Sequence, residues 1–189
     1  MILSGKDLIV IAAGAAIIAA GAAGLYIDYT SRLATDRSDQ IGTITFKKKT
    51  AERKYNDQMI WEDIGKESPI FNNDTIRTAE GSSAVVNLAD GTKIDLDENT
   101  LVMLSLTSSG ADIDLAGGSI FANASEGGAS KGSLNIRSGT TAISVKGGAL
   151  NLTKTAEKAL DVSVASGTAT VAGATGPVSV GANQILQVS

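Results

Sequence analysis

The sequence predicts an all-β domain preceded by one transmembrane helix. Two observations predict the β domain: apolar and polar residues alternate in many short runs, and glycines separate these runs at intervals of about ten residues. A third observation predicts the helix, because one uninterrupted apolar segment lies near the start of the 189 residues. We therefore divide the chain into residues 1–7, 8–27, 28–40 and 41–189.

The apolar segment from Leu8 to Ile27 contains no charged residue, and as a helix it would match the roughly 30 Å hydrocarbon core of a bilayer. We predict a retained single-pass anchor, with residues 1–7 as a cytoplasmic stub. A cleaved signal peptide is the alternative, although the apolar run exceeds the usual length for one. Small residues recur at four-residue spacing along this segment: Ala12, Ala16, Ala20 and Gly24. Such a stripe suits close packing between helices and predicts a weak homo-oligomer. The alternative is that the spacing only reflects an alanine-rich composition.

Residues 28–40 are polar and are typical of a juxtamembrane linker, and alternation begins after them. Asp90 and Gly91 separate two alternating runs and predict a tight type I′ hairpin. Small side chains in the later strands favour a β-solenoid-like stack of hairpins, with a sandwich as the alternative. Between residues 50 and 64, a helix and a strand are both compatible with the pattern. The predicted strands are 42–46, 84–88, 93–96, 112–115, 119–121, 133–136, 141–145, 149–152, 160–164, 168–171, 178–180 and 185–188.

Charge is unevenly distributed around the net value of −4. Acidic residues dominate between Asp57 and Glu126, so the chain has no coherent basic face for nucleic acid. The basic run before them is either a solvated hairpin tip or a contact for an acidic envelope partner: Lys47, Lys48, Lys49, Arg53 and Lys54. Trp61 is the single tryptophan; it is expected to anchor the core or a hairpin, and if exposed it would be a binding hot spot.

The chain contains no histidine and no cysteine, which excludes Ser-His-Asp and Cys-His catalysis and the usual zinc ligands. We predict neither enzymatic activity nor a cofactor. The spacing of three oxygen-bearing residues resembles the opening of a calcium loop: Asp95, Asp97 and Asn99. The glycine and the glutamate that occur later in such loops are absent from this segment. Asp112 and Asp114 form a second acidic pair on one strand face. An oxygen-ligated cation is therefore the alternative to a solvated sheet surface.

The most specific pattern in the chain follows Trp61. It comprises Asp74, Thr75, Ile76, Arg77 and Thr78, then a Gly-Ser pair at 81–82, and then the hairpin residues Asp90, Gly91 and Thr92 after a leucine at 88. This pattern resembles the FecR domain, whose core has a Trp, Asp-Thr-Ile-Arg-Thr, Gly-Ser and Leu-x-Asp-Gly-Thr. Weaker similarities at 115–121, 145–150, 160–171 and 178–184 extend the resemblance from about residue 41 to the C-terminus. We expect Asp74 and Arg77 to form an ion pair or a turn cap rather than a catalytic pair.

The resemblance implies a β-rich periplasmic domain held at the inner membrane by one helix. The best-known members relay a signal from an outer-membrane receptor to a cytoplasmic sigma factor through a cytoplasmic domain. Residues 1–7 are too short to form such a domain. We therefore expect an anchored scaffold or signalling module that binds an envelope protein. The alternative is a domain that binds cell-wall glycan or a divalent cation.

Overall fold

The structure, a computed structural model, describes residues 13–26, 40–56, 58–124, 133–155, 159–173 and 176–188. The chain divides into two compact units, Met1–Ser38 and Asp39–Ser189. In the first unit a helix covers residues 13–26, and it carries Ala16, Ala20 and Gly24 at helical spacing, whereas Ala12 lies outside the described residues. Nowhere in the described ranges does a helix combine the length and apolarity required to cross a membrane. Residues 8–12 and 27 of the predicted span, and 28–39 of the linker, lie outside those ranges.

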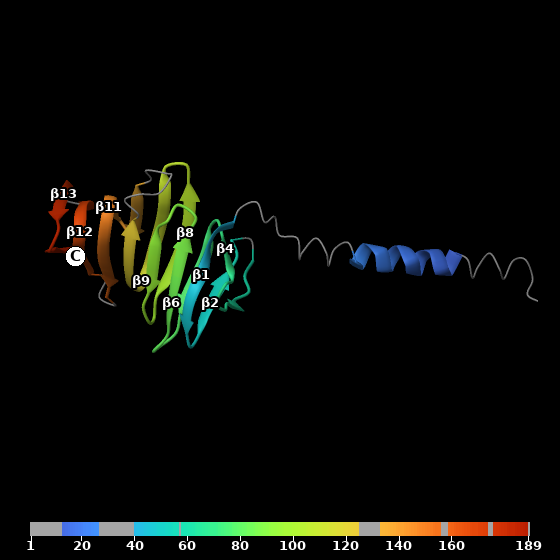
Figure 1. The fold of residues 1–189 in the computed structure, drawn as a ribbon. Helices are drawn as coiled ribbons and strands as arrows, with labels where there is room; N and C mark the ends of the chain where they lie inside the picture. Colours follow the sequence, from blue (N-terminus) through green and yellow to red (C-terminus); the bar gives the residue numbers. More distant parts are fainter. Residues whose placement is uncertain are drawn as a thin grey trace, which may run out of the picture. The chain divides into compact units, whose positions relative to one another are not determined.

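The second unit is all-β, as predicted, and its 14 strands belong to one hydrogen-bonded sheet (Figure 1). The pairings fold this sheet into two layers, because three long strands pair with different neighbours in their two halves. The long strands are β9 (Gly110–Ala124), β11 (Thr141–Lys154) and β12 (Leu160–Gly173). The described strands form no solenoid-like stack of separate hairpins, because the long strands run through both layers.

Layer 1 contains, from edge to edge, β4 (Pro69–Phe71), β1 (Gln40–Lys48), β6 (Ser83–Leu88), β7 (Lys93–Leu96), the second halves of β9 and β11, the first half of β12, and β14 (Gln184–Val188). Layer 2 contains β3 (Glu62–Asp63), β2 (Ala51–Lys54), β5 (Asp74–Thr78), β8 (Leu101–Thr107), the first half of β9, β10 (Leu134–Ser138), the first half of β11, the second half of β12, and β13 (Gly176–Gly181). All pairs are antiparallel except β9 with β10.

One hydrophobic core is built from both layers. Alternate residues of strands such as β6, β7 and β10 are buried in it, as a half-buried sheet requires. Layer 1 contributes side chains such as Ile44 and Ile94, and layer 2 contributes Ile76 and Leu104, all fully buried. Aliphatic residues fill this core, because only 4% of the chain is aromatic.

Each long strand changes its inward-facing phase at a glycine. In β9 the buried positions are 111, 113 and 115 before Gly117 and Gly118, and 120, 122 and 124 after them. The same one-residue change occurs at Gly147 and Gly148 in β11 and at Gly167 in β12. The register shifts at these points, which is the signature of a β-bulge that bends a strand and increases its twist. The bulges keep apolar side chains in the core on both sides of each bend.

These bulges correct the sequence prediction, which treated the same glycines as turns between separate strands. Residues 112–115 and 119–121 belong to β9, residues 141–145 and 149–152 to β11, and residues 160–164 and 168–171 to β12. Bulges and turns both favour glycine, because both can require positive φ. Glycine spacing alone therefore does not distinguish a bulge within one strand from a turn between two strands.

Two predicted hairpins also differ from the structure. The basic run 47–54 is not a hairpin, because β1 and β2 do not pair with each other and the corner at 49–50 links layer 1 to layer 2. The hairpin at Asp90 and Gly91 exists, but it has three loop residues, since Leu88 and Thr92 are hydrogen-bonded across it. Only Gly91 has positive φ there, so the turn is not type I′. Residues 50–64 contain β2 and β3 and, in their described part, no helix.

We predict that Gly118→Ala lowers the free energy of unfolding by about 3 kcal/mol, because the bend has no room for a Cβ. Gly118 has φ +89°, and a Cβ there would meet the Cα of Thr100 and lie 2.7 Å from the carbonyl oxygen of Asn99. Urea unfolding of the two proteins measures the difference. Gly117→Ala is the matched control, because a Cβ at that neighbouring position has nothing within 4 Å. Equal unfolding midpoints for the two variants would contradict the importance of the bend.

Candidate functional site

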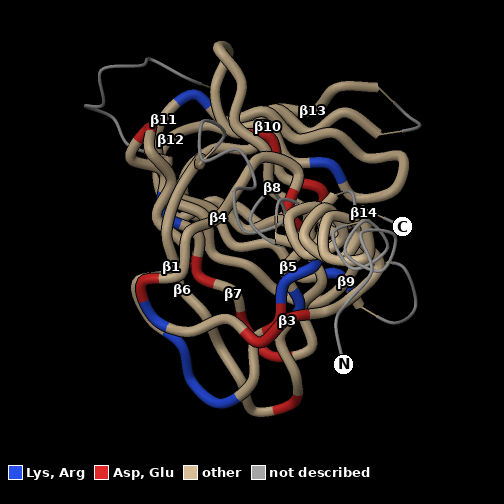
Figure 2. The backbone as a smooth tube through the Cα atoms, turned by 90° about the vertical axis from the view of Figure 1, so that its right-hand side faces the viewer, with Lys and Arg blue, Asp and Glu red and all other residues tan. Residues whose placement is uncertain are grey.

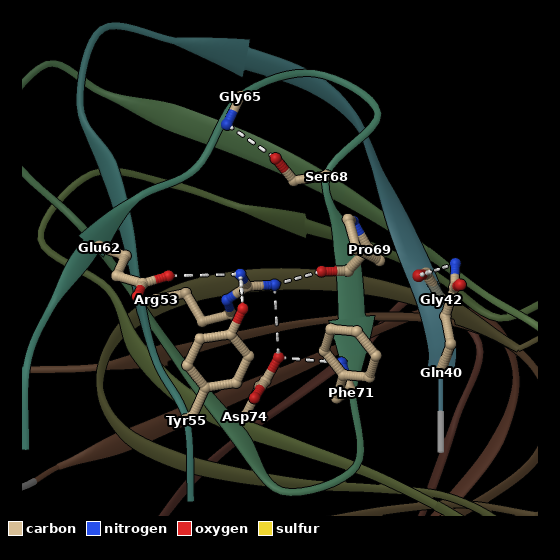
Figure 3. Close-up of polar contacts among 10 residues, drawn as sticks. All are labelled: Gln40, Gly42, Arg53, Tyr55, Glu62, Gly65, Ser68, Pro69, Phe71 and Asp74. Carbon is tan, nitrogen blue, oxygen red and sulfur yellow. Dashed lines mark hydrogen bonds and ion pairs between the residues drawn. The ribbon is translucent and has the colours of Figure 1, made fainter. Parts of the chain in front are cut away.

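A buried arginine organises the polar residues at the end of the domain that contains β2, β4 and β5. Arg53 faces inward from β2 and is only 6% exposed. Its Nη1 donates to the carbonyl oxygen of Pro69, and its Nη2 donates to the hydroxyl of Tyr55 (Figure 3). Two carboxylates complete its surroundings: Asp74 Oδ2 lies 3.8 Å from Nη1, and Glu62 Oε2 lies 3.7 Å from Nη2. The guanidinium therefore meets opposite charge and acceptors on several sides, as a buried cation requires.

Asp74, the first residue of the family pattern, has two structural roles. It is 1% exposed, and its Oδ2 accepts the backbone N–H of Phe71 at 2.9 Å, which closes the turn between β4 and β5. The same oxygen faces Arg53. The turn-cap expectation for Asp74 therefore matches the structure, but the ion-pair partner in the structure is Arg53 and not Arg77.

Aromatic rings enclose this cluster. The guanidinium carbon of Arg53 lies 4.1 Å from the centre of the Tyr55 ring, and the rings of Tyr55 and Phe71 are 6.0 Å apart. Burial raises the pKa of the Tyr55 phenol, while the Arg53 cation opposes this shift. The phenol therefore stays neutral over the physiological range. We define these four residues, Arg53, Tyr55, Phe71 and Asp74, as the arginine cluster; their contacts join β2, β4 and β5.

Other residues of the family pattern also stabilise turns. Thr78 donates its hydroxyl to the carbonyl oxygen of Asp97 at 2.5 Å and accepts the N–H of Thr100 at 3.0 Å. Asp90 accepts from the N–H of Thr92 at 2.9 Å and from its hydroxyl at 3.0 Å, which fixes the β6–β7 turn at Gly91. The pattern is therefore explained by local structure.

Thr75 and Arg77, also in the pattern, lie on the outer surface of β5. Arg77 Nε donates to Glu52 at 2.5 Å, and its guanidinium carbon lies 4.2 Å from the centre of the Trp61 ring. Lys54 Nζ lies 5.8 Å from the same ring centre. Trp61 is half-buried between these two cations, so it is part of the surface rather than of the hydrophobic core.

The basic run is divided by the fold. Arg53 is internal, Lys54 lies beside Trp61, and Lys47 is paired with Asp63 at 2.6 Å. Lys48 and Lys49 are exposed at the corner between β1 and β2. Figure 2 shows acidic and basic segments interspersed around β1, β3 and β5. The five residues therefore do not share one surface, and a contact with an acidic partner stays a prediction for Lys48 and Lys49.

The acidic pairs of the sequence analysis lie apart. Asp95 is on β7 in layer 1, whereas Asp112 and Asp114 are on the first half of β9 in layer 2. Within the described ranges, no three acidic side chains come together in a way that could hold a metal ion. The geometry of the described residues therefore gives no support to a cation shared between the two pairs.

Two surface features were not found from the sequence. A groove of about 840 Å³ lies beside the bend of β9, the turn between β10 and β11, and the ends of β11, β12 and β14, lined by Gly117, Gly118, Ser138, Gly139, Thr140, Thr141, Lys154, Thr155, Leu160 and Val188 among others. A loop between β2 and β3 exposes Met59 and Ile60 beside Trp61. The groove has no local sequence pattern, because its lining comes from segments far apart in the chain. The loop could have been found from the sequence, because three large apolar residues in succession do not fit the apolar–polar alternation of a half-buried strand.

Residues 74–170, slightly more than half of the chain, match the FecR protein family. The chain therefore belongs to the FecR family, as the sequence pattern around Asp74 predicted. An uncharacterized protein of Treponema pallidum (strain Nichols) is 32% identical over 139 residues, which cover 73% of this chain. The chain spans only 20% of that relative's length.

Solved structures share the fold. Two crystal structures of a candidate anti-sigma factor from Parabacteroides distasonis ATCC 8503 superimpose with TM-scores of 0.52 and 0.51, at 21% and 19% identity. In each case 61% of this chain and 59% of the other chain are covered. At such low identity the similarity establishes the fold of the β domain.

We predict that Arg53→Met destabilises the protein by about 3 kcal/mol, because it removes the cation facing the buried Asp74 carboxylate. Asp74→Asn should cost less, since the amide oxygen still accepts the Phe71 N–H. In the double variant the two losses should be less than additive, which a double-mutant cycle of urea unfolding measures. Lys54→Met is the control on the same strand, expected within about 0.5 kcal/mol of the parent. A loss no larger than that control would refute a structural role for Arg53.

Proposed function

We propose that this FecR-family protein is a non-enzymatic, membrane-anchored module that binds a protein partner in the cell envelope, as a scaffold or in signalling. The apolar segment from Leu8 to Ile27 would hold it in the inner membrane, with the β domain in the periplasm. Family membership and the fold shared with a candidate anti-sigma factor support a regulatory role over a catalytic one.

The observation that carries the proposal is the open edge at the C-terminal end of the sheet. In the described part of the chain, β13 and β14 each pair with β12 alone, in different layers. Ile185 on β14 is 75% exposed and Val178 on β13 is 44% exposed, so this edge offers unpaired backbone together with apolar side chains. Such an edge can accept a strand from a partner protein.

We predict that a photo-crosslinking amino acid at position 185 captures a discrete envelope protein from intact cells. The matched control is position 142, which is also exposed but lies on β11 with strands paired on both sides. Mass spectrometry of the adducts should show a product at 185 that is absent or at least about fivefold weaker at 142, because only the edge position adjoins free backbone. Equal labelling at both positions would count against edge recognition.

A second candidate function, binding of cell-wall glycan, is supported by the groove beside the bend of β9. Three glycines contribute no side chains to its walls, and four residues that carry hydroxyls line it: Ser138, Thr140, Thr141 and Thr155. Lys154 adds one cation, which would suit a carboxylate on an otherwise neutral, hydroxyl-rich ligand.

If glycan binds in this groove, a disaccharide-peptide fragment of cell-wall glycan should raise the melting temperature of the protein. Thr140→Val should reduce that shift, because it removes a lining hydroxyl while preserving side-chain shape. Thr168→Val, at an exposed position outside the groove, should leave the shift unchanged. Absence of any shift at millimolar ligand would eliminate this candidate.

A further inference from the structure

The loop between β2 and β3 carries apolar side chains that the fold does not use. Met59 is 95% exposed and Ile60 is 70% exposed, although the hydrophobic core lies only a few residues away on either side. Trp61 follows them and lies between the cations of Arg77 and Lys54. We call residues 59–61 the apolar loop. An aliphatic tip, an aromatic ring and flanking cations form the combination that proteins place at a membrane–water boundary.

The apolar loop emerges where the chain begins its β domain. Gln40, the first residue of β1, pairs with Phe71, and the Phe71 ring lies 6.0 Å from the Tyr55 ring (Figure 3). A turn then follows directly, since the N–H of Gln58 donates to the carbonyl oxygen of Tyr55 at 3.2 Å. The arginine cluster therefore connects Gln40 to the base of the apolar loop, at one end of the domain.

Negative charges that would oppose contact with an anionic surface are compensated around the loop. Glu62 lies 3.7 Å from Arg53, Asp63 pairs with Lys47 at 2.6 Å, and Glu52 pairs with Arg77 at 2.5 Å. Lys54 has no carboxylate partner among the described residues. Because Arg53 also faces Asp74, the local balance of the described side chains is neutral, with Lys54 as a cation beside Trp61.

We propose that the apolar loop inserts into the surface of the lipid bilayer. This inference rests on the proposed membrane anchor: about a dozen residues separate Ile27 from Gln40, so Gln40 would stay within roughly 45 Å of the membrane surface. Because the tether joins the domain at Gln40, the proposal places the end containing Gln40 toward the bilayer. The apolar loop lies at that end, and the C-terminal edge remains available for a protein partner.

Trp61 permits a direct test, because it is the only tryptophan in the chain. The full-length protein is reconstituted into vesicles of phosphatidylethanolamine and phosphatidylglycerol with or without brominated acyl chains. Brominated lipid should quench Trp61 fluorescence by roughly half, because an interfacial side chain lies next to the upper acyl chain. Met59→Ser with Ile60→Ser should remove most of this quenching. Ile185→Ser is the matched control, since it removes an exposed aliphatic side chain from the far edge of the sheet and should leave the quenching unchanged.

Vesicle flotation separates the two ideas that could fail. Protein that floats with the vesicles but shows no quenching by brominated lipid refutes the apolar-loop inference and leaves the anchor intact. Protein that does not float refutes the anchor itself. Quenching that persists in the Met59→Ser, Ile60→Ser variant also overturns the inference, because contact would then not depend on the loop. A blue-shifted Trp61 emission that appears only when a soluble envelope extract is added would assign the loop to a protein partner instead.

Discussion

The architecture depends on three strands that must bend while keeping their apolar side chains inside. A strand with strict alternation presents one face throughout, so carrying β9, β11 and β12 from one layer into the other requires a local change of phase. The bulges provide this change at Gly117–Gly118, Gly147–Gly148 and Gly167. At Gly148 a Cβ would overlap the backbone of Ser166 on the neighbouring strand, so the bends of adjacent strands also pack directly against each other. Glycine is thus required both by backbone conformation and by the close approach of strands.

The bends also explain the placement of the functional candidates. At the bend of β9, Gly117 and Gly118 carry no side chain, and together with Gly139 of the β10–β11 turn they line the groove. At the opposite end of layer 2, the short strands β2 and β3 lack a long partner to cover them. Arg53 and its carboxylates provide the cohesion that a larger apolar contact would otherwise supply. The polar cluster is therefore a feature of a sheet edge, which explains its many partners.

Much of the fold could be predicted from alternation, because a half-buried sheet imposes a period of two on its residues. The predicted strand positions in β6, β7 and β10 agree with the structure within two residues. The joining of strand halves was missed, because the shift of the apolar positions from odd to even numbers across Gly117–Gly118 is compatible with a turn as well as with a bulge. The inward position of Arg53 could not be predicted, because in the sequence it is one cation among neighbouring lysines. Its burial depends on Tyr55, Pro69 and Asp74, which meet only in the folded domain.

Membership of the FecR family constrains the scaffold more than the partner. Asp74, Thr78, Asp90 and Thr92, which carry the resemblance, all form hydrogen bonds that close turns of this domain. Residues used in this way can be shared by proteins with different partners, since they specify only where the strands begin and end. Recognition must then come from surfaces outside the pattern, and two apolar surfaces of that kind lie on different edges of the sheet: the apolar loop beside β3, and Ile185 on β14. If the apolar loop enters the bilayer as proposed, the second surface at the far edge stays accessible to a protein partner.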